Sequence, residues 1–246
     1  MLEINDLSVQ VGNKIILKDI NFSIKKDVPA VLFGPNGSGK STFLKAVMGF
    51  DGYNIVKGDI VFKGKRINDL PTEKRVKMGL GIMYQHPPQI RGVKLAQIAA
   101  FLSKDDKLVA GLAQRLSLSG HMERDINMGF SGGEMKRSEL FQILLQDPEL
   151  VLLDEPESGV DLENISIMGK VLNEFLKKSG KSALMITHTG YILDYVKSEN
   201  GCVMIEGKLW CVGNTRPWLR RAWTRRKIPG RGLFCKKTAM SASRAA

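Results

Sequence analysis

The sequence has few of the features that mark membrane-spanning, secreted or disulfide-built proteins. No apolar run in its 246 residues approaches the roughly 18 residues that a membrane span needs, so we expect no membrane span. The first six residues hold neither a basic region nor an apolar stretch, which argues against a secretory signal. Three cysteines are too few for a disulfide framework, and the expected location is therefore cytoplasmic.

Acidic residues are absent from residues 214–246, although the whole chain has a formal net charge of +12. Ten of the 37 basic residues lie in this tail, which leaves 27 basic against 25 acidic residues in residues 1–213. The basic excess therefore says nothing about what the rest of the chain binds. The tail mixes cations with Trp218 and Trp223, a mixture that could bind nucleic acid or an anionic membrane. It could also be a divergent or frame-shifted end, and we expect it to be flexible, without nucleic acid as a partner.

Short apolar segments alternate with segments of helical spacing over residues 1–213. Because 43% of the chain is hydrophobic, it can bury a core. The patterns predict strands over 2–11, 16–24, 30–33, 59–62, 150–153 and 183–186, a hairpin over 202–212, and helices over 42–49, 92–130, 134–146 and 162–178. This alternation indicates an α/β fold with a mainly parallel sheet covered on both faces.

A glycine-rich segment follows the strand predicted at 30–33 and fits the phosphate-binding pattern G-x-x-x-x-G-K-[ST]. Its glycines allow backbone N–H groups to wrap a polyphosphate, and the next helix directs its positive end at the same charge. We expect Lys40 to reach the β- and γ-phosphates and Ser41 to bind Mg²⁺. The flanking strand and helix favour this interpretation over a chance turn. The predicted nucleotide-binding residues here are Gly34, Pro35, Asn36, Gly37, Ser38, Gly39, Lys40, Ser41 and Thr42.

Two carboxylates, Asp154 and Glu155, end the apolar strand predicted at 150–153. Buried carboxylates are costly without a cation or hydrogen bonds, so an adjacent pair at a strand end indicates a site, although an exposed turn is the simpler alternative. Beside a phosphate loop, Asp154 is expected to hold Mg²⁺ through water. Glu155 is expected to polarise the attacking water as general base.

A second phosphate-binding surface is predicted where residues Ser131, Gly132, Gly133 and Glu134 open a helix. The same residues also form a helix N-cap, with Ser131 as cap and Glu134 at the third helical position. The two interpretations are compatible, because the N–H groups of such a cap can bind a ligand.

Residues 131–134 resemble the signature motif of ATP-binding-cassette ATPases, and the order of motifs over residues 1–213 is also that of this family. The resemblance implies a P-loop, RecA-like core with an antiparallel β subdomain and a small helical subdomain at about 90–132. It implies that Gln85 contacts Mg²⁺ and couples to a partner. It also implies that residues 158–161 cross a dimer interface and that His188, otherwise an ordinary strand-end residue, senses the γ-phosphate. Two protomers of this family sandwich ATP, so an ATP-dependent homodimer is expected, with ATP and Mg²⁺ as cofactors.

Three stretches, residues 58–65, 84–93 and 127–137, are similar to the SufC-type ATPases of iron–sulfur cluster assembly. A fourth similarity is Val11, which stands in place of the adenine-stacking aromatic residue of transport cassettes. Loss of that ring corresponds to about 1–3 kcal/mol of stacking, and Tyr53 could substitute for it. Pro156 departs from the bacterial SufC pattern and matches transport cassettes, and the segment between Gln85 and Ser131 is shorter than in bacterial SufC proteins.

The narrower resemblance implies a soluble SufB-like scaffold as partner, which ATP-driven closure of two copies would remodel. We expect the scaffold to bind in the groove beside Gln85, which includes His86, Pro87 and Arg91, although these residues could form a solvated loop. The three cysteines have no metal-ligand spacing, so the cluster is expected on the scaffold. The alternatives are the ATP-binding subunit of a membrane transporter and a nucleic-acid-binding module that uses the basic tail.

Overall fold

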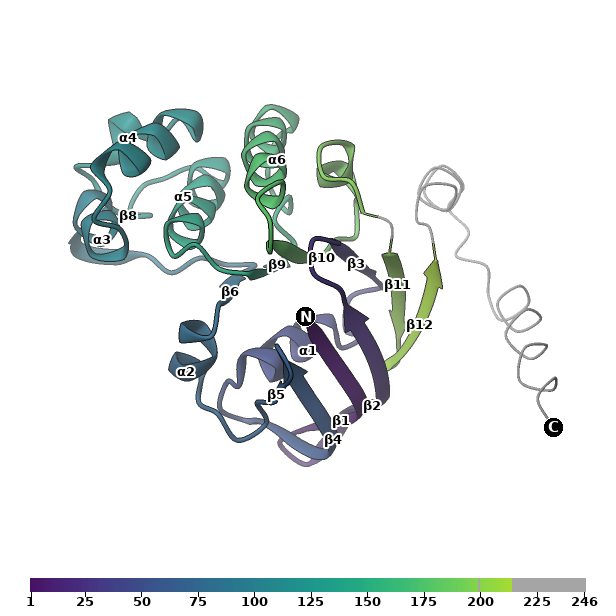
Figure 1. Cartoon of the computed structure of the whole chain (residues 1–246). Helices are drawn as coiled ribbons and strands as arrows, with labels where there is room; N and C mark the ends of the chain where they lie inside the picture. Colours follow the sequence, from purple (N-terminus) through teal and green to yellow (C-terminus); the bar gives the residue numbers. More distant parts are fainter. Residues whose placement is uncertain (199, 214–246) are drawn as a thin grey trace, which may run out of the picture. The chain divides into compact units, whose positions relative to one another are not determined.

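Three β-sheets organise the part of the chain that the structure, a computed structural model, describes: residues 1–198 and 200–213 (Figure 1). These residues belong to one compact unit. The basic tail, with Trp218 and Trp223, lies outside the described residues.

The first sheet has four antiparallel strands in the order β2-β1-β4-β5: β2 (Lys14–Ile24), β1 (Leu2–Val11), β4 (Tyr53–Phe62) and β5 (Lys65–Arg66). Gly12 at φ 57° permits the tight turn from β1 to β2. Strand β4 begins six residues before the predicted 59–62, because residues 53–57 also pair with β1.

The second sheet has six strands in the order β12-β11-β3-β10-β9-β6. Strands β3 (Ala30–Phe33), β6 (Leu80–Met83), β9 (Leu150–Asp154), β10 (Ser182–Ile186) and β11 (Asn200–Ile205) run parallel, and β12 (Lys208–Gly213) adds an antiparallel edge. Strand β6 was not predicted, although the apolar run Leu80–Met83 was a usable signal.

Burial on both faces of this sheet explains why residues 150–153 of β9 are all apolar. In β9, Leu150 and Leu152 pack into the cluster shared with the four-stranded sheet and α1 (Lys40–Met48). The alternate residues Val151 and Leu153 pack into a second cluster with the helices of the other face. Because β9 contributes to two cores, its polar residue, Asp154, stands at its C-terminal end.

Seven further helical segments follow α1 within residues 1–198 and 200–213, and most lie near the predicted positions. They are α2 (Thr72–Lys77), α3 (Leu95–Leu102), α4 (Asp106–Arg115), η1 (Ser119–His121), α5 (Gly132–Leu145), α6 (Leu162–Leu176) and η2 (Tyr191–Asp194). Helix α5 begins two residues before the predicted 134, because the Ser131 side chain caps it.

The prediction of helical structure across residues 92–130 was wrong at both ends. Strands β7 (Ile90–Lys94) and β8 (Asp125–Ile126) pair with each other and enclose α3, α4 and η1. Gly92 lies at φ 80°, which helical residues do not adopt, and its N–H donates to the Asp125 carboxylate at 2.8 Å.

Cys202 and Cys211 lie directly opposite each other in the β11–β12 hairpin and form a disulfide. Sequence reasoning expected no disulfide framework and missed this single pairing. The turn lies at Glu206 and Gly207, as predicted, and both residues have positive φ.

None of the helices within residues 1–198 and 200–213 combines the length and apolar character of a membrane span.

Candidate functional site

The glycine-rich loop connects β3 to α1, as its sequence context predicts. Its glycines adopt positive φ at Gly34, Gly37 and Gly39. A Cβ at Gly34 would lie 2.3 Å from the Met204 carbonyl oxygen, and one at Gly39 would lie 2.7 Å from the Leu17 side chain. Glycine is therefore required at these two positions by conformation and by space.

The tip of the β11–β12 hairpin braces this loop from outside. The Gly207 N–H donates to the Ser38 carbonyl at 3.0 Å, and the Gly207 carbonyl accepts from the Lys18 N–H at 2.9 Å. The loop is thus fixed between β2 and the edge hairpin, which keeps its backbone shape independent of a ligand.

Lys40 turns back over the loop that precedes it. Its Nζ donates to the carbonyls of Gly34 and Pro35, each at 2.9 Å, and the residue is only 5% exposed. Burial lowers the Lys40 pKa, while the nearby Glu155 and Asp154 carboxylates oppose this. The N-cap residue of α1, Gly39, offers no side chain to the first N–H groups, so these donors are available to an anion.

Asp154 brings a carboxylate to the start of α1, because β9 lies beside β10, which pairs with β3. Burial raises the Asp154 pKa, and a hydrogen bond with the Ser41 side chain opposes the rise. Two buried oxygens here, Asp154 Oδ1 and Ser38 Oγ, have no hydrogen-bond partner in the described residues. A carboxylate, a hydroxyl and unpartnered oxygens are oxygen ligands that fit Mg²⁺ beside a phosphate.

Glu155 is the centre of a group drawn from three loops. Its Oε2 accepts a hydrogen bond from Gln85 Nε2 at 2.8 Å, and its Oε1 lies 3.4 Å from His188 Nδ1. The geometry brings Gln85, Glu155 and His188 together, although they come from segments far apart in the sequence. Such a group can orient and deprotonate a water molecule beside the glycine-rich loop.

The Glu155 backbone is held at φ 49°, a conformation that residues other than glycine rarely adopt. Its N–H donates to the Ile186 carbonyl at 3.0 Å, which ties it to the end of β10. Strain of this kind persists where neighbouring contacts fix the chain, and it clusters at functional sites.

Two buried residues of α5, which sequence reasoning missed, support the same group. Lys136 Nζ donates to the carbonyls of Tyr84 at 3.1 Å and Glu155 at 3.3 Å, and Glu139 accepts from the Tyr84 N–H at 3.4 Å. Burial lowers the Lys136 pKa to about 8 and raises the Glu139 pKa to about 7. No local sequence pattern indicates these contacts, because the partners lie 19 to 55 residues apart in the sequence.

Residues 131–134 form the predicted N-cap. The Ser131 Oγ accepts from the Glu134 N–H at 3.3 Å, and Glu134 Oε2 accepts from the Ser131 N–H at 2.7 Å. His121 Nε2 lies 3.1 Å from Glu134 Oε1, and the Ser131 hydrogen bonds and His121 lower the Glu134 pKa. Within the described residues, no hydrogen bond joins this segment to the phosphate loop of its own chain.

Residues 17–158 match the family described as ABC transporter. The chain belongs to this family. It is therefore an ATP hydrolase of the ATP-binding-cassette type, with ATP as its nucleotide.

Similar proteins carry related names. The cassette is 40% identical to a probable ATP-dependent transporter, ycf16, of Trieres chinensis, over 85% of this chain and 89% of the relative. It is 35% identical to a probable ABC transporter ATP-binding protein of Streptococcus pyogenes serotype M18, over 87% of this chain and 89% of the relative.

Solved structures share the fold of this cassette. One ATP-binding cassette of an ABC transporter matches with a TM-score of 0.79 at 20% identity, over 93% of this chain and 96% of that one. A dimeric cassette in a post-hydrolysis state, bound to ADP and phosphate, matches with a TM-score of 0.75 at 21% identity, over 87% and 98% of the two chains. The predicted P-loop cassette fold is confirmed.

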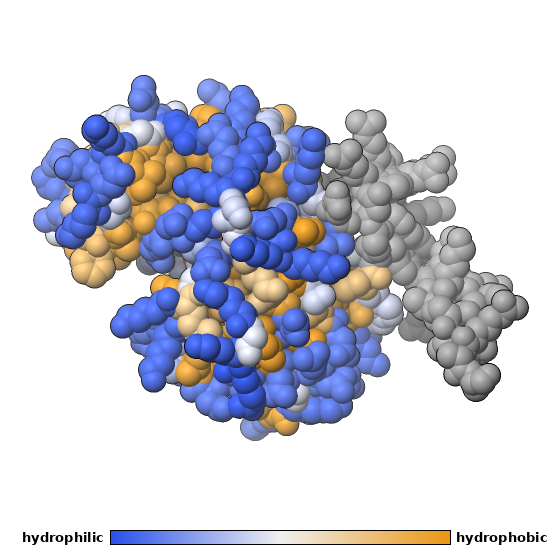
Figure 2. Space-filling view, in the orientation of Figure 1, coloured by the Kyte–Doolittle hydropathy of each residue, from blue (hydrophilic) through white to orange (hydrophobic). Residues whose placement is uncertain are grey.

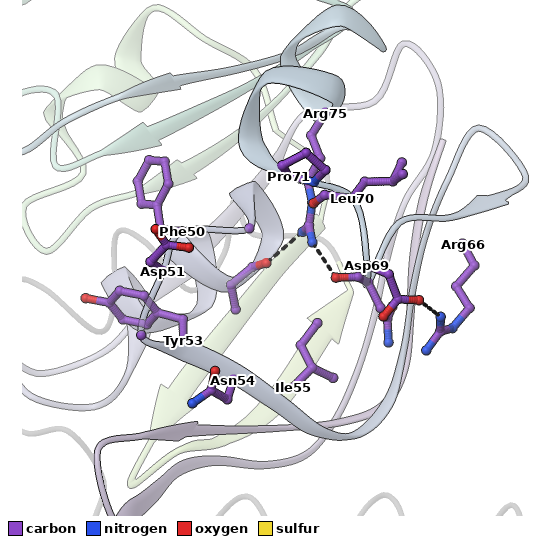
Figure 3. A pocket seen from close by; sticks show the side chains of 14 residues that line it. Phe50, Asp51, Tyr53, Asn54, Ile55, Arg66, Asp69, Leu70, Pro71 and Arg75 are labelled. Atoms are coloured by element: carbon purple, nitrogen blue, oxygen red, sulfur yellow. Dashed lines mark hydrogen bonds and ion pairs between the residues drawn. The ribbon is translucent and has the colours of Figure 1, made fainter.

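A cavity of about 430 Å³ lies at the other end of α1 in this cassette (Figure 3). Tyr53 lines it, and Lys45 Nζ lies 5.3 Å from the centre of the Tyr53 ring. Tyr53 pairs with Val11 across β1 and β4, but its ring is beside the C-terminal turn of α1, not beside the phosphate loop. The structure therefore gives no support to Tyr53 as the substitute for an adenine-stacking ring.

Proposed function

We propose that this ABC ATPase works in iron–sulfur cluster assembly, where ATP binding, dimerisation and hydrolysis remodel a soluble SufB-like scaffold protein. The proposal rests on the resemblance of residues 58–65, 84–93 and 127–137, and of Val11, to SufC-type ATPases. We place the protein in the cytoplasm, and we expect the scaffold to carry the cluster.

The proposed chemistry assigns one role to each residue of the site. Lys40 and the N–H groups of residues 34–42 hold the phosphates. Ser41, Asp154 and Gln85 hold Mg²⁺, which neutralises phosphate charge when bound. Glu155 is the general base, and His188 contacts the γ-phosphate. The unpartnered Asp154 Oδ1 and the 2.8 Å contact between Gln85 and Glu155 support these roles.

A second copy is proposed to complete the site, with residues 131–134 of one protomer facing the phosphate loop of the other. Its support is the helix N-terminus at Gly132, where the Ser131 side chain accepts from the Glu134 N–H, and the absence, in the described residues, of a hydrogen bond from this segment to its own phosphate loop. A lone protomer should therefore hydrolyse ATP poorly.

The proposed coupling to a partner is supported by the hydrogen bonds that the loop after β6 forms. His86 in this loop and Arg91 in the following strand β7 are exposed, while Tyr84 and Gln85 at the start of the loop form hydrogen bonds with Lys136 and Glu155. A scaffold that binds the exposed part therefore pulls on the residues that hold the general base. Hydrophobic side chains also reach the surface of the lobe that contains α3 and α4, where Phe101 is 78% exposed (Figure 2).

The test is to replace the chromosomal copy with Glu155→Gln and to assay an iron–sulfur enzyme in the cells. We expect its activity to fall while the amount of its polypeptide and the activity of a metal-independent enzyme stay unchanged. An iron–sulfur enzyme that keeps full activity would contradict the proposal.

A second candidate is the ATP-binding subunit of a membrane transporter. The names of the relatives and Pro156, which matches transport cassettes, favour it. In that case the groove beside Gln85 would bind a cytoplasmic segment of a permease, and the Glu155→Gln cells would lose uptake of one solute.

A further inference from the structure

Glu157 is a buried carboxylate that the roles described above do not use. It lies two residues after Glu155 and is 4% exposed. Within the described residues no cation pairs with it, and a buried carboxylate without a cation requires several hydrogen bonds. Its surroundings must therefore supply donors.

All the donors come from one segment, residues 187–192, that carries His188. Oε1 accepts from the Thr187 and Thr189 hydroxyls and from the Gly190 N–H at 2.8 Å. Oε2 accepts from the Ile192 N–H at 2.5 Å. These four hydrogen bonds, three to Oε1 and one to Oε2, come from residues on both sides of His188.

The His188 side chain has no comparable anchor of its own. It is 41% exposed, and its Nδ1 lies 3.4 Å from Glu155 Oε1 without a hydrogen bond in the described residues. The position of the imidazole is thus set by the backbone on either side of it, and that backbone is held by Glu157.

We propose that Glu157 is a positioning residue that holds His188 in register with Glu155 and with the γ-phosphate. The Glu157 carbonyl also accepts from the Val160 N–H at 3.3 Å, so the same residue anchors the start of the loop at residues 158–161. The inference rests on the proposed contact of His188 with the γ-phosphate.

A purely structural role is the competing explanation. Glu157 accepts from the N–H groups of Gly190 and Ile192, at the start of η2, and could stabilise that short helix without any effect on catalysis. A structural role predicts a lower melting temperature with kcat unchanged. A positioning role predicts a lower kcat and a displaced His188.

The chain contains three histidines, His86, His121 and His188, so the ring signals in a ¹H–¹³C spectrum of the full-length protein can be assigned by substitution. We compare Glu157→Gln with Glu163→Gln, which removes an exposed carboxylate from the start of α6. Glu157→Gln is expected to shift or broaden the His188 signal alone and to lower kcat about 10- to 100-fold, with the dissociation constant for ADP unchanged. Glu163→Gln should leave all three signals and kcat as in the wild type.

The control for the proposed function is His188→Ala measured alone. If His188→Ala leaves kcat unchanged, the γ-phosphate role fails, whatever Glu157 does. If His188→Ala lowers kcat but Glu157→Gln changes neither the His188 signal nor kcat, the positioning role is overturned. If Glu157→Gln does not fold, Thr187→Val removes one donor and Glu157→Asp keeps the charge. A positioning role then requires that Thr187→Val displaces His188 and that Glu157→Asp retains more activity than Thr187→Val.

Discussion

At the scale of single residues, the site depends on charges that are buried and held by a few contacts. Glu155 is the clearest case, because its carboxylate contacts Gln85 and His188 while its backbone is strained at φ 49°. Lys40 and Glu139 are similarly enclosed. Substitutions that keep the shape of these side chains and change only their charge are therefore the most informative.

Glu155→Gln should abolish turnover and leave ATP binding intact. The amide keeps the volume of the side chain but cannot accept a proton from water, so we expect kcat to fall by about 10²- to 10⁴-fold. Phosphate release gives the rate, and a fluorescent ATP analogue gives the affinity. The variant is also expected to trap an ATP-bound dimer, and turnover at the wild-type rate would refute Glu155 as the base.

Lys40→Ala should weaken nucleotide binding itself. A charged hydrogen bond contributes roughly 1.5–3 kcal/mol, so the dissociation constant for ATP is expected to rise about 10- to 100-fold. Lys45→Ala is the matched control, because Lys45 lies in the last turn of the same helix. Equal affinities for ATP in Lys40→Ala and wild type would be incompatible with the phosphate-loop assignment.

Glu139→Gln should change how stability depends on pH. The Glu139 pKa is raised from 4.5 to about 7, so between these values the folded protein keeps a proton that the unfolded chain has lost. The stability that this proton contributes is complete below pH 4.5 and is lost as the pH rises through 7. The glutamine cannot titrate. The unfolding free energy of Glu139→Gln minus that of the wild type should therefore rise by about 1–3 kcal/mol from pH 5 to pH 8.

Denaturant unfolding at pH 5, 6.5 and 8 measures this difference. Glu3→Gln, which replaces an exposed carboxylate in β1, should show no such trend. A difference between Glu139→Gln and wild type that stays constant across the three pH values would show that Glu139 has an ordinary pKa.

At the scale of elements, helix α1 is fixed at both ends by different means. Its N-terminus carries the phosphate loop. At its C-terminus, the buried guanidinium of Arg75, which Figure 3 shows, donates to the carbonyls of Ala46 at 2.9 Å and Val47 at 2.8 Å. Arg75 also donates to Leu70 and Asn68 carbonyls at 2.7 and 2.8 Å, so one side chain joins α1 to the segment before α2.

Arg75→Met should destabilise the fold and leave the chemistry of the site unchanged. The substitution leaves four carbonyls without their donor, which is expected to cost about 2–4 kcal/mol of unfolding free energy. Arg66→Met is the control, because Arg66 is exposed and water screens its ion pairs with Asp59 and Asp69, so that their loss should have little effect on stability. A loss no greater for Arg75→Met than for Arg66→Met would contradict the role of Arg75.

The elements that could be predicted from the sequence are those whose pattern follows from local burial. The first four residues of strand β9 are apolar because both its faces are buried, and the loop at 34–41 has the spacing expected of a phosphate-binding loop. Strands β7 and β8 were missed because their pairing joins residues 31 or more positions apart. Lys136 and Glu157 were missed for the same reason, since their partners lie in other loops and nothing in their own neighbourhood marks them.

At the scale of the whole molecule, the central claim is that two copies of this ATPase work on a soluble scaffold in iron–sulfur cluster assembly. One chain supplies the phosphate loop, the proposed general base and a signature segment that has no hydrogen bond to its own phosphate loop in the described residues. Partner identity therefore decides between cluster assembly and transport more directly than any property of the isolated chain.

The measurement that tests this claim most directly is purification of the protein from its native cell extract, with analysis of what accompanies it. We predict a soluble partner protein, with iron and acid-labile sulfide in the complex. A polytopic membrane permease as the accompanying protein, without iron or sulfide, would contradict the account and make the groove beside Gln85 a docking site for that permease.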